Sequence, residues 1–467
     1  MPQHKREGRL PTVLHISQPV DGGVARVVVD LVRSQARSGL RVVVACPPGG
    51  GLGDAAADAG AEVLSWPAGR EPGRRLPLET LRLARLIRRA RPGLVHAHSA
   101  KAGLAARLAV RGRIPTVYQP HAWSFEAVGG RTAELALRWE RYAARWAQRV
   151  LCVSEDERLR GVRAGVPGRW AVVRNGVDTD RFRPAGPAAR EDARAALPAL
   201  RELPHRAPLV VCVGRLCRQK GQDVLLRAWP AVAAAVPGAV LALVGDGPDH
   251  GALREAAPPG VLFAGAADDT APWYTAADLV VLPSRWEGMA LAPLEAMACA
   301  RPVVVSEVAG ARESLAPGHA DGCLVPPEDP RALARALTAL LLDPGRRRTL
   351  GEQAREQVRG AYDIRRTTAA VTRLYGDLLR PAPFTPHPSV PGRPKRGPSA
   401  HGRPEEPGPS AAARAEPGPC APAPAGDGPS GQGPSGQGLP GGAAPGARQG
   451  PVDRPGPSTD SRERIRR

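Results

Sequence analysis

The sequence is short of aromatic residues, of paired cysteines and of acidic charge. Aromatic residues make up 4% of the 467 residues, and they do not alternate with basic residues as single-stranded nucleic acid binding requires. The seven cysteines are an odd number, and no two of them form a Cys-x-x-Cys pair. This argues against a disulfide framework and a structural zinc site, and it favours a reducing cytoplasm.

The distribution of apolar residues indicates neither a secretory leader nor a membrane span. Residues 1–10 are polar and charged, with no apolar run behind them. One uncharged stretch, 228–245, is 18 residues long, but Pro230, Pro237 and Gly238 would interrupt a spanning helix. We therefore expect a cytoplasmic protein.

The shortage of acidic residues leaves a net charge of +20, carried almost entirely by arginine. Such an excess can indicate nucleic acid, an anionic membrane surface or phosphorylated substrates as partners. A general preference for Arg, Ala, Gly and Pro would produce the same balance. Because no helix-turn-helix or zinc-finger signature is present, we expect no nucleic acid partner.

Composition divides the chain. Residues 381–467 consist mainly of Pro, Gly, Ser, Ala and Arg, and they include a tandem Gly-Pro-Ser-Gly-Gln repeat. Such a segment buries too little apolar area to offset its ordering entropy, so we expect a disordered tail. The remainder is predicted to form an N-terminal domain (10–185), a C-terminal domain (205–362) and a helix crossing back to the first domain (363–380).

Short β-branched runs alternate with longer amphipathic stretches in both domains. Apolar strands separated by helices predict parallel sheets covered on both faces, whose ligands sit at the carboxyl ends of the strands. The fold class is therefore α/β, with two Rossmann-like doubly wound domains that face a central cleft. The expected strands are 13–17, 41–45, 94–98, 116–119, 150–154, 209–213, 239–244, 261–263, 279–282 and 302–306, and the clearest helices are 24–38, 78–91, 100–111 and 131–148.

Two of the strand ends carry features suited to an anion. Gly22 and Gly23 open the first helix, where backbone amides can approach a phosphate, although a plain tight turn would look the same. Arg215 and Lys220 follow the first strand of the second domain. A planar guanidinium and a point charge at a strand end favour phosphate binding over a solvated surface loop.

A loop and helix entrance after strand 279–282 give the strongest signal. Glu287 and Glu295 bracket it with seven residues between them. Carboxylates suit bidentate hydrogen bonds to the vicinal hydroxyls of a sugar or ribose. The backbone amides between them suit a phosphate, and they belong to Gly288, Met289, Ala290 and Leu291.

These motifs, in this order, resemble family 4 of the glycosyltransferases, bacterial type, whose members have the GT-B architecture. The resemblance covers about residues 13–379. It includes the Glu-x7-Glu pair and the further pieces Asn175-Gly176-Val177-Asp178 with Phe182 and Pro184, Gly214-Arg215-Leu216 with Lys220-Gly221, and Gly245-Asp246-Gly247-Pro248. Neither Gly245-x-Gly247 nor the glycines at 49–53 complete a dinucleotide fingerprint, so we interpret both as turns.

The resemblance also implies roles for single residues. Arg215 and Lys220 would hold the donor diphosphate, Glu295 the ribose and Glu287 the transferred sugar. His121 matches a family histidine close to the reacting sugar, although a lone histidine beside a proline is more often structural. At Met289, Ala290 and Leu291 the sequence differs from the residues usual in the family, so the family does not indicate which sugar is transferred. Gly22 and Gly23 would meet the phosphates or the acceptor.

The implied activity is retaining transfer of a hexosyl or N-acetylhexosaminyl group from a UDP- or GDP-linked donor to a hydroxyl, without a metal or other cofactor. Polysaccharide, glycolipid or cell-envelope glycan synthesis is the expected setting, with a sugar or lipid-linked acceptor. A small acceptor such as inositol phosphate is the alternative. A catalytically silent GT-B partner protein and a Rossmann oxidoreductase are the remaining alternatives.

One predicted helix bears on where the enzyme works. In 131–148, four arginines recur at helical spacing beside three aromatic residues: Arg138, Arg141, Arg145 and Arg149, with Trp139, Tyr142 and Trp146. A basic face beside an aromatic face is typical of a helix that rests on an anionic membrane surface. The alternative is that the aromatic residues pack onto the sheet and the arginines are simply solvated.

Overall fold

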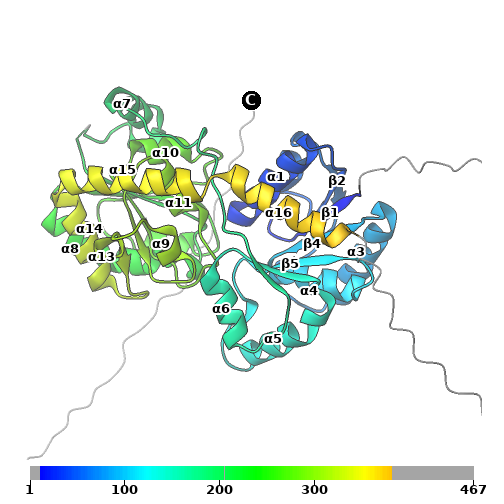
Figure 1. Ribbon diagram of the computed structural model, residues 1–467. Coiled ribbons are helices and arrows are strands. Elements are labelled where there is room, and N and C mark those ends of the chain that lie inside the picture. Colours follow the sequence, from blue (N-terminus) through cyan, green and yellow to red (C-terminus); the bar gives the residue numbers. More distant parts are fainter. Residues whose placement is uncertain (1–10, 205, 381–467) are drawn as a thin grey trace, which may run out of the picture. The chain divides into compact units, whose positions relative to one another are not determined.

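The computed structural model describes residues 11–204 and 206–380. The segment 381–467, predicted to be a disordered tail, lies outside the described residues. The described chain forms two α/β lobes, each built on a wholly parallel sheet (Figure 1). The predicted fold class is thereby confirmed.

The N-terminal lobe contains a seven-stranded sheet in the order β3-β2-β1-β4-β5-β6-β7. The central strands β1, β2 and β4 are buried along their whole length, which explains why they are apolar apart from three histidines and one serine. The edge strands β3 and β7 were not predicted from the sequence, because they are partly exposed and lack a run of apolar residues. The strands are β1 Val13–Ser17, β2 Val42–Cys46, β3 Glu62–Ser65, β4 Leu94–His98, β5 Thr116–Gln119, β6 Arg149–Cys152 and β7 Trp170–Val172.

The helices of this lobe connect successive strands. They are α1 Gly22–Arg37, α2 Gly51–Asp58, α3 Leu76–Ala90, α4 Ser99–Val110, α5 Gly130–Ala143 and α6 Glu155–Arg163, with 3-10 turns η1 Ser124–Glu126 and η2 Ala144–Trp146. The prediction of one helix over 131–148 was wrong at its end. Because the chain tightens into η2 and enters β6 at Arg149, that arginine belongs to a strand and not to the basic helix face.

The C-terminal lobe contains a six-stranded sheet in the order β10-β9-β8-β11-β12-β13. Its strands are β8 Leu209–Val213, β9 Val240–Val244, β10 Val261–Gly265, β11 Leu279–Leu282, β12 Val303–Ser306 and β13 Leu324–Val325. Its helices and 3-10 turns are α7 Pro187–Ala196, η3 Pro198–Leu200, η4 Arg218–Lys220, α8 Gln222–Ala235, α9 His250–Glu255, α10 Ala271–Ala276, α11 Leu291–Ala298, α12 Ala311–Ser314, α13 Ala320–Cys323, α14 Pro330–Leu342 and α15 Pro344–Ala361.

In each sheet the chain order reverses at one place, between β1 and β4 in the first lobe and between β8 and β11 in the second. Loops leaving adjacent strands in opposite directions at such a switch point open a crevice at the carboxyl edge. The loops after β1, β4, β8 and β11 are therefore where a ligand can be bound.

The chain crosses between the lobes twice at one point. The backbone amide of Val177 donates to the Tyr362 carbonyl at 2.8 Å, and the amide of Ile364 donates to the Val177 carbonyl at 3.0 Å. A Cβ atom on Gly176 would lie 2.8 Å from the Ile364 Cα, so glycine is required where the segments touch. The last helix, α16 (Ile364–Leu379), then packs against α1 and β4.

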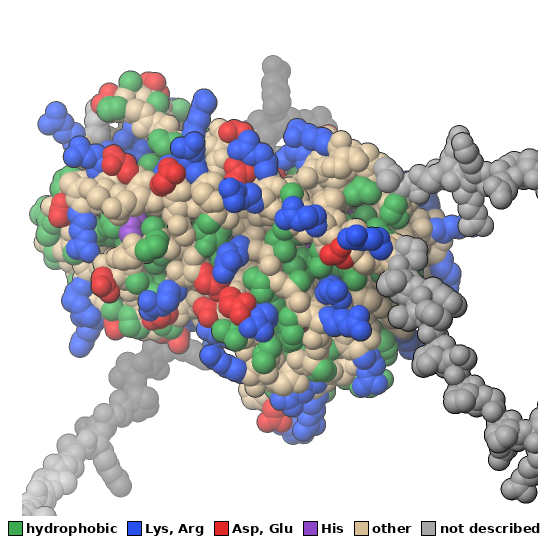
Figure 2. All heavy atoms as spheres, viewed as in Figure 1, with side chains coloured by type: hydrophobic (Ala, Val, Ile, Leu, Met, Phe, Trp, Pro, Cys, Tyr) green, Lys and Arg blue, Asp and Glu red, His purple; other side chains and the backbone are tan. Residues whose placement is uncertain are grey.

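Three global features bear on the sequence expectations. Among the described residues, no helix has both the length and the apolar character needed to traverse a bilayer. Lysine and arginine side chains are spread over both lobes on the face seen in Figure 2, without one dominant basic patch. The six cysteines of the described chain are unpaired.

Candidate functional site

The switch point of the C-terminal lobe brings together two of the residues predicted from sequence. Lys220 Nζ donates to Glu287 Oε1 at 2.5 Å, and Ser284 Oγ donates to the same oxygen at 2.7 Å. Lys220 lies in the loop after β8 and Glu287 in the loop after β11, so adjacent strands place them in contact. Lys220 and Ser284 together hold the buried Glu287 carboxylate in one orientation at the crevice.

Glycines allow these loops to pass one another. Gly221 has a φ of +66°, and a Cβ atom there would lie 2.1 Å from the Pro283 carbonyl oxygen. The Gly245-x-Gly247 pair behaves similarly, because Cβ atoms at these positions would lie 2.1 and 2.2 Å from backbone oxygens of Gly214 and Leu216. These glycines serve close backbone packing, as expected for turns.

The second glutamate of the motif has different partners. Glu295, on α11, accepts hydrogen bonds from Tyr274 Oη at 2.8 Å and from Thr270 Oγ1 at 3.4 Å. Its other oxygen pairs with Arg26 of α1, in the opposite lobe. Burial, and then the nearby Glu295 carboxylate, raises the pKa of the Tyr274 hydroxyl well above its usual value. Sequence reasoning missed Arg26, which lies 269 residues from its partner.

A second cation from the N-terminal lobe faces the loop after β8. Burial, and next the neighbouring Arg215 guanidinium, lowers the pKa of Arg70. Arg70 lies in the loop between β3 and α3, where no apolar periodicity draws attention to it. Two like charges held near each other from different lobes favour an anion between them. Arg70 therefore joins Arg215 as a candidate phosphate ligand.

The two predicted glycines of the first lobe lie beside the Glu-x7-Glu loop. Helix α1 begins at Gly22, whose φ is +77°. A Cβ atom on Gly23 would come 3.7 Å from the Leu291 Cδ1 atom at the start of α11. The starts of α1 and α11 thus lie side by side, with Ala290 as the N-cap residue of α11.

His121 faces the same loop. It follows β5 with a φ of +59°, and Ala122 continues with a φ of +139°, both unusual for residues other than glycine. The His121 carbonyl carbon would lie 2.9 Å from a Cβ atom placed on Gly288. Strained backbone of this kind is retained where its position serves the site.

The N-terminal lobe also holds the two residues that follow Glu287. Ser154 Oγ donates to the Gly288 carbonyl at 2.7 Å, and Asn175 Nδ2 donates to the Met289 carbonyl at 2.8 Å. Glu157 lies close behind Gly288, and burial raises the pKa of its carboxyl to about 8. These contacts fix the carbonyls on one side of the loop.

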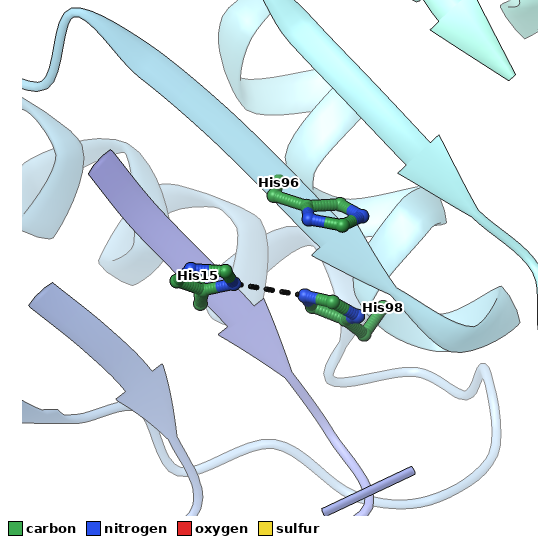
Figure 3. Close-up of side chains that lie close together, drawn as sticks. All are labelled: His15, His96 and His98. Atoms are coloured by element: carbon green, nitrogen blue, oxygen red, sulfur yellow. Dashed lines mark hydrogen bonds between the residues drawn. The ribbon is translucent and has the colours of Figure 1, made fainter. Parts of the chain in front are cut away.

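A cluster of imidazoles lies below this edge. His15, His96 and His98 come from β1 and β4, are fully buried, and have ring nitrogens within 4.8 Å of one another (Figure 3). Neutral imidazole is a common transition-metal ligand, so these side chains could hold a metal ion. No sequence pattern joins His98 to His15, because the two residues lie 83 positions apart on different strands.

The expectation of a metal-free site took the sequence to lack an Asp-x-Asp pattern, and this was wrong, because Asp178-Thr179-Asp180 is one. The Asp178 carboxylate accepts hydrogen bonds from the backbone amides of Asp180 and Arg181, both at 3.0 Å. Thr179 donates to Asp363 at 2.8 Å. These contacts make the segment a turn at the crossing between the lobes.

Comparison with known proteins agrees with this geometry. Residues 21–181 match the model of Glycosyltransferase Family 4, and residues 207–343 match that of Glycosyl transferases group 1. The D-inositol 3-phosphate glycosyltransferase of Streptomyces bingchenggensis is 33% identical over 62% of this chain and 68% of its own length. An Escherichia coli UDP-Gal:alpha-D-GlcNAc-diphosphoundecaprenol alpha-1,3-galactosyltransferase is 28% identical over 64% of this chain and 78% of its own length.

Solved structures show the same architecture. HepE from Anabaena, determined with UDP and glucose, superposes with a TM-score of 0.67 over 79% of this chain and 100% of its own, at 22% identity. Two Rossmann-like lobes, a Glu-x7-Glu loop at the second switch point and sequence similarity along both lobes lead to one conclusion. The chain belongs to glycosyltransferase family 4 and is a GT-B glycosyltransferase that uses a nucleotide sugar.

Proposed function

We propose that this enzyme transfers a hexosyl or N-acetylhexosaminyl group, with retention of configuration, from a UDP- or GDP-linked donor to a hydroxyl acceptor. The acceptor domain is residues 10–185 and the donor domain 205–362, with 363–380 bracing the first domain. The observation that carries the proposal is the contact between Lys220 and the Glu287 carboxylate at the carboxyl edge of the second sheet, with Arg215 in the same loop as Lys220. Sugar hydroxyls and a diphosphate need this combination of carboxylate and cations at one edge.

Each residue then has a chemical task. Arg215 and Lys220 bind the diphosphate and stabilise the charge that develops on it as the bond to the sugar breaks. The amides of residues 288–291 add donors at the entrance of α11. Glu287 accepts hydrogen bonds from the transferred sugar. Glu295 accepts hydrogen bonds from the ribose, which replace the bond that Glu295 makes with Arg26 in the free enzyme. These fixed charges replace the divalent ion that other transferases use, so no metal is required.

Relatives favour a UDP-linked donor. The Anabaena structure contains UDP and glucose, and the name of the Escherichia coli relative specifies UDP-galactose. Thermal-shift measurements against a panel of UDP-, GDP- and ADP-sugars would identify the donor. NMR of the transferred product would give its anomeric configuration. The proposal would be contradicted if none of the nucleotide sugars raised the melting temperature, or if the product had the inverted anomeric configuration.

The location of the enzyme determines which acceptor it can reach. We propose that it is a sugar on a polysaccharide or lipid precursor at the inner membrane face. Leu135 is 67% and Tyr142 48% exposed on α5, and Trp139, Tyr142 and Trp146 contact one another there. The Arg145 guanidinium carbon lies 3.8 Å from the Tyr142 ring centroid. The exposed Leu135 and Tyr142, with Arg145 against the tyrosine ring, support docking on anionic lipid, while Trp139 and Trp146 are half-buried behind them.

Vesicle co-sedimentation tests this docking. The enzyme should bind phosphatidylglycerol-containing vesicles and not purely neutral ones, and salt should weaken the binding. Arg141→Glu with Arg145→Glu should abolish it, whereas the matched pair Arg331→Glu with Arg335→Glu, on α14, should not. Equal binding to both vesicle types would instead favour a soluble acceptor such as an inositol phosphate, as used by the Streptomyces relative.

A further inference from the structure

A line of hydrogen bonds runs through the N-terminal lobe and ends at His121. Gln35 Oε1 on α1 lies 2.9 Å from His15 Nε2. His15 Nδ1 lies 3.0 Å from His98 Nε2, the contact drawn as a dashed line in Figure 3. His98 Nδ1 in turn lies 3.2 Å from His121 Nε2. Four side chains from four elements are thereby linked from the interior to the crevice.

The first residue fixes the polarity of the line. An amide oxygen only accepts, so His15 carries its proton on Nε2. A neutral imidazole has one N–H, and His15 Nδ1 must therefore accept from His98 Nε2. The same step leaves His98 Nδ1 to accept from His121 Nε2. His121 then keeps Nδ1 as its one ring nitrogen with a free lone pair.

This arrangement of protons requires neutral rings, and the surroundings of the rings keep them neutral. His15 and His98 are fully buried, and none of the hydrogen bonds described for these rings involves a carboxylate. Burial lowers the pKa of His15 to about 4 and that of His121 to about 3. Burial, and next the neighbouring His96, lowers the pKa of His98 well below its usual value.

The contacts favour this line over a metal ion bound by the same rings. His15 and His98 already share a hydrogen bond, with their facing nitrogens 3.0 Å apart. His96 lies against His98 with ring centroids 3.9 Å apart. Its Nδ1 atom is 2.5 Å from the hydroxyl of Tyr375 on α16. His96 is therefore a neighbour of the line and not a member of it.

We propose that Gln35, His15 and His98 are positioning residues that hold His121 in the Nε2–H tautomer, so that its Nδ1 accepts a hydrogen bond from a substrate hydroxyl in the crevice. No proton moves along the line, since its function is orientation. The inference rests on the proposed function only in placing His121 next to substrate. The tautomer of His121 is a property of the free enzyme.

The decisive variant is Gln35→Met, which keeps the length of the side chain and removes the acceptor three hydrogen bonds away from His121. Nitrogen-15 NMR of histidine-labelled full-length enzyme separates N–H from lone-pair ring nitrogens, and the His121→Gln variant assigns the His121 signals. In the wild type, His121 should show a protonated Nε2 and an unprotonated Nδ1. Gln35→Met should add the opposite tautomer and lower kcat/KM about tenfold, the scale of one oriented hydrogen bond.

Gln119→Met is the matched control, because Tyr375 hydrogen-bonds with Gln35 and its removal would disturb the line itself. Gln119→Met makes the same exchange at a buried glutamine that interacts with His96, and it leaves the four members of the line in place. It should lower the melting temperature while the His121 tautomer and kcat/KM stay unchanged. An equal loss of activity in both variants would show that only packing was disturbed and would overturn the proposal.

Two further outcomes separate this inference from the function on which it rests. An unchanged His121 tautomer in Gln35→Met would overturn the line itself, whatever the activity. Full activity of His121→Gln would overturn the contact with substrate, even if the tautomer responds to Gln35. One equivalent of tightly bound zinc in purified enzyme, lost in His15→Gln, would show a metal site instead.

Discussion

The two lobes share one strand order around their switch points, but the side chains there are mainly neutral in one lobe and charged in the other. The N-terminal lobe places buried, neutral imidazoles within β1 and β4, and His121 after β5. The C-terminal lobe places ionised groups in the corresponding loops, with Lys220 against Glu287. The same backbone edge can thus serve a diphosphate with fixed charges or a hydroxyl with oriented neutral groups. The fold supplies the crevice, and the side chains decide its chemistry.

Removing the cations of the C-terminal lobe should have the largest effect. Arg215→Ala or Lys220→Ala should lower turnover by about a hundredfold or more, the scale of losing a preorganised charge that stabilises the transition state. The fold should survive, because both residues lie between β8 and α8, outside the sheet and the α-helices. Arg227→Ala, an exposed arginine on the nearby α8, is the control and should stay near wild type. Wild-type rates in Arg215→Ala and Lys220→Ala would contradict the comparison.

The neutral imidazoles of the N-terminal lobe predict a second effect, on stability. Histidines whose pKa is lowered on folding take up protons in the unfolded state first, so stability falls as pH drops below about 6.5, the unfolded value. Each such group contributes about 1.4 kcal/mol per pH unit until its folded pKa is reached, about 4 for His15 and about 3 for His121. Urea unfolding at pH 7.5, 6.5, 5.5 and 5.0 would measure the slope.

Glu157 sharpens this test, because it acts in the opposite direction. Burial raises the pKa of its carboxyl to about 8, so its contribution to stability is present at low pH and is lost as pH rises from about 4.5 towards 8. Glu157→Gln cannot titrate and should therefore steepen the loss of stability between pH 6.5 and 5. Stability that is flat or that rises on acidification in this variant would show that the buried histidines are already charged.

The smallest effect is expected from metal removal. If fixed cations stabilise the departing diphosphate, activity should be unchanged in excess EDTA, within the error of the assay. The same assay with added magnesium or manganese is the control for a weakly bound ion. Loss of activity in chelator that either metal restores would contradict a donor site built on Arg215 and Lys220 alone.

Much of the C-terminal half of the site could be predicted from the sequence. Its residues follow β8 and β11 directly, and a strand end determines the position of the next few residues. Glu287, Lys220 and the amides after Gly288 could therefore be named from spacing and strand order. The edge strands β3 and β7 and the end of α5 could not, since their short or half-exposed patterns carry no clear periodicity.

Contacts between distant segments were decided by the tertiary structure. Arg26 reaches Glu295 across 269 residues, and His15 reaches His98 across 83. No local pattern marks either pair, because each side chain taken alone fits an ordinary helix or strand. The amino-acid sequence by itself determined the two parallel sheets and the charged loop of the second lobe, through local burial and spacing. Only folding determined which cation meets Glu295 and which imidazole contacts His121, because packing of the lobes brings α1 to α11 and sheet order brings β4 between β1 and β5.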